Sequence, residues 1–171
     1  GVMPMSDSGS TSGQCESALP AGVCVRVFRP ADEAAAVALW HACGLLRPWN
    51  DPHKDIARKL AEQPELFLVA VLPGAQPDGA DRLIGTVMAG YDGHRGWVYY
   101  LAVDPAWQRH SLGRCLMQRV EADLLAAAVG DEAQVFLELR GVEAEHAARH
   151  GVFGIGVLEF DAALDQLLDL V

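Results

Sequence analysis

The chain has 171 residues and a formal net charge of −10 at pH 7, with 51% hydrophobic and 21% charged residues. This length fits one ordinary domain, and the composition excludes general disorder, collagen and a disulfide-dense scaffold. The acidic excess argues against nucleic acid and anionic membranes as partners, because both are normally met by basic surfaces. No apolar run approaches the ~18 residues that a membrane span needs. We therefore expect neither nucleic acid nor a membrane as a partner.

The N-terminus and the cysteines favour a reducing, cytoplasmic setting. The first residues lack the basic start and apolar stretch of a secretory signal. The cysteines show no CxxC and no paired Cys/His pattern, so neither a zinc site nor a disulfide framework is indicated. They are Cys15, Cys24, Cys43 and Cys115. We predict cytoplasmic localisation, reduced thiols and no metal site.

The first third of the chain predicts a leader, a strand and a helix. Residues 1–22 are rich in Ser and Gly, which is typical of a flexible leader before a single domain at residues 23–171. The run Val23–Phe28 favours a strand. Apolar residues at helical spacing predict a helix over Glu33–Cys43. The two residues that flank this helix are its candidate caps. These are Asp32 at its start and Gly44 after its end.

The middle of the chain predicts a second helix and three strands. The Pro- and Asn-containing loop 45–52 ends in Asp51-Pro52, a pair that suits a helix start. The continuous apolar run 66–72 is typical of a strand covered on both faces. The helix is expected at 53–62 and the strands at 66–72, 83–91 and 97–103, with a turn at 92–96 joining the last two.

The last third predicts a long helix followed by shorter elements. A helical stripe of apolar residues marks the helix at 112–129. Beyond it, the pattern favours a strand at 135–139, a helix at 142–150, a strand at 151–160 and an amphipathic tail at 161–171. Strands interleaved with helices in this order define an α/β (α+β) domain with a mixed sheet.

One strand-to-helix connection has the features of an anion site. The strand at 97–103 runs into a polar loop, and a helix then begins with small residues in its first turn. Such a turn aligns backbone N–H groups, and the helix N-terminus adds partial positive charge, which suits a phosphate or pyrophosphate. Arg109 and Arg114 supply side-chain cations. The alternative is an ordinary connection with solvated arginines.

This connection resembles motif A of the GCN5-related N-acetyltransferases (GNAT), in which a strand ending Leu-Ala-Val-Asp-Pro precedes Arg/Gln-x-x-Gly-x-Gly/Ala. Ser111 stands at the first glycine position of this pattern. A serine there is compatible with the motif if the backbone needs no positive φ. Segments 45–52 and 90–96 resemble two segments of the YpeA-type branch of that family, so the resemblance spans residues 23–139. The six motif positions are Gln108, Arg109, His110, Ser111, Leu112 and Gly113.

The resemblance implies the GNAT-like acyl-CoA N-acyltransferase fold, a central mixed, mostly antiparallel twisted sheet flanked by helices. It also implies acetyl transfer from acetyl-CoA to a primary amine by direct attack in a ternary complex, with a small-molecule or peptide amine as acceptor and a possible homodimer. The pyrophosphate is expected on backbone N–H groups from Arg109 to Arg114, beside Gln108. The pantetheine arm is expected along Leu101, Ala102 and Val103 by strand-like hydrogen bonds, with an N–H near Leu101 or Ala102 holding the oxyanion.

The catalytic residues are less defined, because the family's base carboxylate is missing from the start of the cofactor strand, Gly96-Trp97-Val98. Tyr100 and His94 are our catalytic candidates, with Asp92 and Tyr99 also nearby. Strand alternation predicts that Tyr99 and Tyr100 point to opposite faces, so that one lines the cleft and the other packs in the core.

The loop between the first two helices borders the acceptor site in this family. Its residues Trp49, Asn50 and Asp51 are therefore candidate acceptor contacts: Asp51 for an ammonium group and Trp49 for stacking. The alternative is that Asp51 only starts the second helix and Trp49 packs in the core.

Two departures leave rival functions open. Ala147 stands where the family carries a tyrosine acid, with His146 and His150 as possible substitutes, and Ser111 replaces a glycine. Both departures favour an acyl-CoA-binding relative with weak or lost catalysis as the alternative. An assembly module is the other rival, since the apolar tail Leu158–Val171 is suited to packing on a partner.

Overall fold

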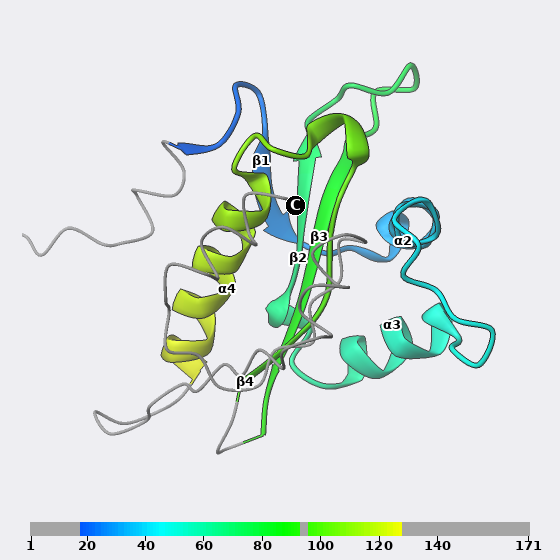
Figure 1. Cartoon of the computed structure of the whole chain (residues 1–171), viewed down its shortest axis with the longest axis vertical. Helices are drawn as coiled ribbons and strands as arrows, with labels where there is room; N and C mark the ends of the chain where they lie inside the picture. The colour runs from blue at the N-terminus through cyan, green and yellow to red at the C-terminus, as the bar shows by residue number, and fades with distance from the viewer. Residues whose placement is uncertain (1–17, 93–95, 128–171) are drawn as a thin grey trace, which may run out of the picture.

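The computed structural model describes residues 18–92 and 96–127. In these ranges the chain forms a four-stranded antiparallel sheet of order β1-β2-β3-β4, with α4 on one face and α2 and α3 on the other (Figure 1). The strands are β1 (Cys24–Val27), β2 (Phe67–Leu72), β3 (Arg82–Tyr91) and β4 (Gly96–Val103). The helices are α2 (Glu33–Ala42), α3 (Pro52–Ala61) and α4 (Leu112–Ala127), with 3-10 turns η1 (Pro30–Asp32), η2 (Pro64–Leu66) and η3 (Pro105–Trp107).

The elements confirm the α/β prediction. Each described strand and helix starts within one or two residues of its predicted start, and each end that is described lies equally close to its predicted end. The strand at 135–139, the helix at 142–150, the strand at 151–160 and the tail at 161–171 lie outside the described residues, as do residues 1–17 of the predicted leader. Within the described ranges, no helix is both long and apolar enough to cross a bilayer.

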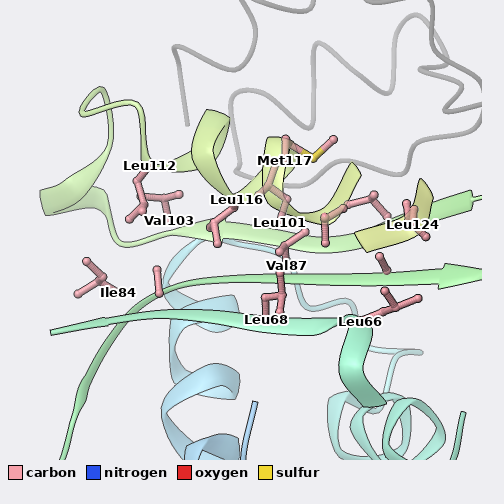
Figure 2. Close-up of a cluster of buried hydrophobic side chains, with 14 of the residues drawn as sticks. Leu66, Leu68, Ile84, Val87, Leu101, Val103, Leu112, Leu116, Met117 and Leu124 are labelled. Carbon is pink, nitrogen blue, oxygen red and sulfur yellow. The ribbon is translucent and has the colours of Figure 1, made fainter. Parts of the chain in front are cut away.

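Two hydrophobic clusters fill the two faces of the sheet. The cluster under α4 joins residues of three strands to the apolar stripe of that helix (Figure 2). Leu19, within the stretch predicted as leader, packs against this cluster. The second cluster lies under α2 and α3 and contains Trp40, Phe67 and Tyr100. The labelled residues of the first cluster are Leu66, Leu68, Ile84, Val87, Leu101, Val103, Leu112, Leu116, Met117 and Leu124.

Strand β2 lies inside the sheet and is covered on both faces, as its continuous apolar sequence predicts. Leu68 and Ala70 belong to the cluster under α4, whereas Phe67, Val69 and Val71 belong to the cluster under α2 and α3. This alternation follows from the two-residue period of a strand. The two clusters therefore meet at β2.

Gly44 is confirmed as the residue that ends α2, with φ 70° and its N–H donating to the His41 carbonyl at 3.0 Å, whereas the two predicted N-terminal caps have different outcomes. Asp51 caps α3: its Oδ1 accepts hydrogen bonds from the backbone N–H groups of His53 (3.0 Å) and Lys54 (3.3 Å). The Asp32 side chain makes no cap bond to α2, so that prediction is wrong. Its carboxylate instead accepts from the Arg29 backbone N–H at 2.8 Å and pairs with Arg26 at 2.7 Å. The Arg26 guanidinium, which is mostly buried, is a stronger partner than a helix amide.

Candidate active site

A β-bulge interrupts the edge strand that carries the predicted site. The register between β3 and β4 shifts between Thr86 and Met88, so Val87 faces two residues of β4, Tyr100 and Leu101. Tyr100 has φ 49°, in the left-handed region that non-glycine residues avoid. A tyrosine thus occupies the position where bulges of this kind often have glycine. Bulges recur next to active sites because they redirect side chains and release backbone groups from the ladder.

The bulge corrects the prediction for the two tyrosines. Tyr99 pairs with Met88 across the strands, and Met88 and Tyr100 belong to the same cluster under α2 and α3. Cross-strand partners share a face, so Tyr99 and Tyr100 lie on one face rather than on opposite faces. The extra residue of the bulge resets the strand alternation. Tyr100 is buried, with 8% of its surface exposed, whereas Tyr99 is 47% exposed.

The Tyr100 hydroxyl is engaged on both sides. It donates to Asp55 Oδ2 at 2.6 Å and accepts from Asn50 Nδ2 at 3.0 Å. The ring stacks on Trp40, with centroids 3.8 Å apart and planes 15° from parallel. Burial raises the pKa of Tyr100, and the hydrogen bond and negative charge of Asp55 raise it further, well above its usual range. The phenol is therefore protonated at neutral pH.

The three predicted acceptor residues have three different surroundings. Asn50 contacts Tyr100, whereas the Asp51 carboxylate serves as the cap of α3. Trp49 is 81% exposed, so the alternative that it packs in the core is wrong. Sequence reasoning missed Asp55, which joins Asn50 at the Tyr100 hydroxyl. Its only sequence signal is an acidic residue in the first turn of a helix, which is common at helix starts.

Along the predicted donor edge, only the backbone is available to a ligand. The side chains of Leu101, Ala102 and Val103 are fully buried. In the described part of the chain, β4 pairs with β3 alone. The Asp104 N–H donates to the Ile84 carbonyl at 2.8 Å, so the polar groups of the preceding residue, Val103, point away from β3, toward the open edge.

The Val103 carbonyl at this edge already has two donors. The side-chain amide of Gln108, one of the predicted loop residues, donates to it at 3.1 Å. The Cys43 thiol donates from the other side at 3.4 Å. Burial raises the pKa of Cys43 to about 11, and Asp104 adds to the effect, so the thiol keeps its proton. Gln108 thus closes the connection between β4 and α4, and the Val103 N–H remains as the donor that faces the edge.

The loop before α4 is strained at two positions. Arg109 has φ 66° and Ser111 has φ 62°. The Ser111 carbonyl accepts the first helical hydrogen bond, from the Cys115 N–H at 3.0 Å. The condition under which the serine was expected to match the motif, a backbone without positive φ, is therefore not met. The backbone takes the conformation of the motif's glycine despite the Cβ, at a cost of about 1–2 kcal/mol.

The geometry of the loop before α4 suits an anion. Turns that combine right- and left-handed residues direct successive N–H groups into one concavity, and the N-terminus of α4 adds partial positive charge. Arg109 provides a cation in the same loop, and His110 packs edge-on against Trp107 with ring centroids 6.3 Å apart. Leu112 anchors the start of the helix, because its side chain is fully buried.

Of the other predicted site residues, Gly113 and Arg114 lie in the first turn of α4. His94 lies outside the described residues, as do Ala147, His146 and His150. The described site therefore consists of the bulge of β4, the polar cluster around the Tyr100 hydroxyl and the loop before α4. The bulge and the loop before α4 follow one another along the chain, and the polar cluster joins the bulge at Tyr100.

Comparison with known proteins identifies the class to which this fold and site belong. The sequence matches the Acetyltransferase (GNAT) family over residues 33–153, which is more than half of the 171 residues. The chain belongs to that family. The match covers β2, β3, β4 and α4, and so includes the bulge and the loop before α4.

Named relatives agree with this class. The chain is 47% identical over 102 residues to an acetyltransferase of Pectobacterium atrosepticum, a match that covers 60% of this chain and 67% of the relative. It is 48% identical over 102 residues to an acetyltransferase of Yersinia enterocolitica, with the same coverage. The fold is similar to that of a crystallised Pyrococcus horikoshii protein assigned to the acetyltransferases, with a TM-score of 0.55 at 16% identity. That match covers 75% of this chain and 42% of the Pyrococcus protein.

Proposed function

We propose that this protein transfers an acetyl group from acetyl-CoA to a primary amine by direct attack within a ternary complex. The observation that carries the proposal is the strained loop at Arg109 and Ser111, which opens α4 directly after the bulged edge strand. Left-handed non-glycine residues persist only where the surrounding structure enforces them, and they cluster at functional sites. Membership of the acetyltransferase family and the named relatives support the same activity.

The donor fits the geometry in two places. Its pyrophosphate is a dianion that suits the backbone N–H groups from Arg109 to Arg114, with Gln108 holding the start of the loop. Its pantetheine arm carries amides and is suited to strand-like hydrogen bonds along Leu101–Val103. The Val103 N–H is the donor that the ladder leaves free at this edge.

The reaction needs little beyond this placement. The neutral amine attacks the thioester carbonyl, the C–N bond forms, the C–S bond breaks and the thiolate leaves. A thiol pKa near 8.5 makes the thiolate an acceptable leaving group without a strong acid. A backbone N–H near Leu101 or Ala102 stabilises the oxyanion, and Leu101 is the better placed of the two because it lies in the bulge, whereas Ala102 pairs with Thr86. A base or a water chain must take the amine proton, and His94 remains our candidate for it.

The acceptor is proposed to bind on the side of α2 and α3. The loop from Trp49 to Asp51 lies on this side, with an exposed indole at Trp49 and an amide at Asn50 that already reaches Tyr100. A net charge of −10 favours a cationic acceptor through long-range attraction. The small-molecule and peptide amines expected from the sequence both satisfy this chemistry.

A second candidate function is acyl-CoA binding with weak turnover. The specific observation in its favour is the Cβ of Ser111 at φ 62°, which adds strain to the loop that holds the donor. Donor binding combined with no thiol release would support this candidate. Thiol release with any amine would favour the transferase.

The test is isothermal titration of acetyl-CoA into the purified protein at moderate salt. We expect micromolar binding that weakens on raising salt and weakens at least tenfold in Arg109→Ala, since a charge-assisted contact to phosphate contributes about 1.5–3 kcal/mol. Arg29→Ala is the matched control, because Arg29 is exposed beside β1, at the opposite edge of the sheet from β4. Absence of binding at millimolar acetyl-CoA would reject the proposal. A panel of amines, followed by free thiol release, then tests transfer.

A further inference from the structure

Four contacts from four different elements hold Tyr100 in its strained backbone conformation. Asp55 of α3 and Asn50 of the preceding loop bind its hydroxyl, at 2.6 and 3.0 Å. Trp40 of α2 stacks on its ring at 3.8 Å. Thr86 of β3 donates from Oγ1 to its carbonyl oxygen at 2.8 Å. Such over-determination is what a bulky left-handed residue needs in order to persist.

The contacts are linked to one another. The Trp40 indole that stacks on Tyr100 donates through Nε1 to Thr86 Oγ1 at 2.8 Å, and the same Oγ1 donates to the Tyr100 carbonyl. Side chain and backbone of Tyr100 are thus fixed by one connected network. Among the described residues, no fully buried side-chain nitrogen or oxygen is left without a partner, so loss of one member leaves a polar group unsatisfied.

The network makes Tyr100 unsuited to proton transfer. Its hydroxyl hydrogen is committed to Asp55, and burial keeps its pKa well above its usual range, so it is not a base at neutral pH. The place of Tyr100 in the chain is more informative, because it immediately precedes Leu101–Val103, the edge along which the proposed function places the acyl donor. A shift of Tyr100 moves that edge.

We propose that Asp55 and Tyr100 are positioning residues: their hydrogen bond ties α3, on the acceptor side, to the bulge of β4, and so fixes the backbone N–H groups that receive the acyl carbonyl. This inference rests on the proposed function and assigns Tyr100 a role different from the catalytic one predicted from the sequence. The 2.6 Å bond to a carboxylate is of the charge-assisted, strong kind. Asp55 also pairs through its other oxygen, Oδ1, with the exposed Arg58, and such an exposed ion pair adds little.

The experiment compares two ligands, acetyl-CoA and CoA, on four variants by calorimetric titration. Tyr100→Phe and Asp55→Ala remove the bond, and Asp55→Asn keeps a side-chain oxygen that accepts it. Tyr99→Phe is the matched control, since Tyr99 is the half-exposed neighbour on the same face. We expect acetyl-CoA to bind about three- to tenfold more weakly to Tyr100→Phe and Asp55→Ala, which is the value of one hydrogen bond to the acetyl carbonyl. CoA, which lacks that carbonyl, is expected to bind these variants nearly as it binds the wild type.

A second readout keeps the test independent of overall stability. Hydrogen–deuterium exchange of a peptide spanning Leu101–Val103 is expected to speed up in Tyr100→Phe and Asp55→Ala, and to return toward wild type in Asp55→Asn. Melting temperatures show whether each variant is folded. If Asp55→Ala does not fold, the pair Tyr100→Phe and Asp55→Asn decides.

The outcomes separate this inference from the proposed function. If the wild type binds acetyl-CoA and both bond-removing variants keep the wild-type preference for acetyl-CoA over CoA, the positioning role is overturned and the proposed function stands. A loss in Asp55→Asn as large as in Asp55→Ala, with Tyr100→Phe unchanged, also overturns it. If the wild type binds neither ligand, both proposals are overturned.

Discussion

The serine at the start of α4 allows the strain of the loop to be measured directly. Ser111 has φ 62° and precedes the first residue of the helix. In this conformation a Cβ costs about 1–2 kcal/mol, whereas glycine adopts it freely. Ser111→Gly therefore removes a cost from the folded state without changing the path of the backbone.

Two opposing terms reduce the gain. Glycine makes the unfolded chain more flexible, which costs about 0.4–1 kcal/mol, and replacing a serine before a helix by glycine costs a few tenths of a kcal/mol. The net expectation for Ser111→Gly is a stabilisation of up to about 1 kcal/mol. For a chain of this size, that corresponds to a rise in melting temperature of about 2–4 °C per kcal/mol.

Ser111→Ala is the matched comparison, because alanine keeps the Cβ and loses the hydroxyl. It therefore retains the strain at φ 62° that the glycine variant removes. We expect Ser111→Gly to exceed Ser111→Ala in free energy of unfolding by up to about 1 kcal/mol. Urea denaturation followed by circular dichroism measures both values. Equal stability of the two variants, or a more stable alanine variant, would refute the strain argument.

Three further predictions concern pH and packing. Because the pKa of Tyr100 is raised in the folded state, the stability that its protonated hydroxyl contributes is complete below pH 10 and is lost as pH rises further. In urea titrations, the decline of unfolding free energy above pH 10 is expected to be shallower in Tyr100→Phe, by up to about 1.4 kcal/mol per pH unit. The pKa of Asp81 is lowered by the Gly74 N–H and by Arg26, so the stability that its carboxylate contributes is present above pH 4 and lost on acidification. Asp81→Asn is therefore expected to reduce the fall of the melting temperature as the pH is lowered. In Gly85→Ala, the new Cβ would lie 3.2 Å from Leu116 Cδ1 and 3.3 Å from a backbone oxygen, so a destabilisation of about 1–3 kcal/mol is expected by chemical denaturation.

Much of the fold follows from short-range signals in the sequence. The apolar run of β2 predicts a strand covered on both faces, and Asp51-Pro52 predicts the start of α3 together with its cap. Both signals arise from the backbone's own needs, which are burial of apolar side chains and partners for helix amides. Asp32 shows the limit of this reasoning, because a cap signal does not reveal that Arg26, from a neighbouring strand, takes the carboxylate.

The site was harder to predict, because its main feature contradicts local preference. Nothing in Tyr99-Tyr100-Leu101 indicates a bulge, since bulges with a left-handed residue normally announce themselves by a glycine. The alternation rule then placed the two tyrosines on opposite faces. Asp55 was missed for a different reason: its contact with Tyr100 spans 45 positions of sequence, so only the packing of α3 on the sheet brings the two groups together.

The failures of local rules themselves help to locate the site. Among the described residues, the non-glycine positions with positive φ are Gln63, Tyr100, Arg109 and Ser111, and the last three lie within twelve residues of one another. A strained residue that had no role would be replaced by glycine at little cost, or relieved by a small shift of the chain. Three such residues in one strand–loop–helix unit, with Tyr100 held by side-chain contacts and Ser111 by the start of α4, indicate a backbone shape that the protein must maintain. We propose that this shape aligns N–H groups from β4 to α4 for the thioester carbonyl and the pyrophosphate of the proposed donor.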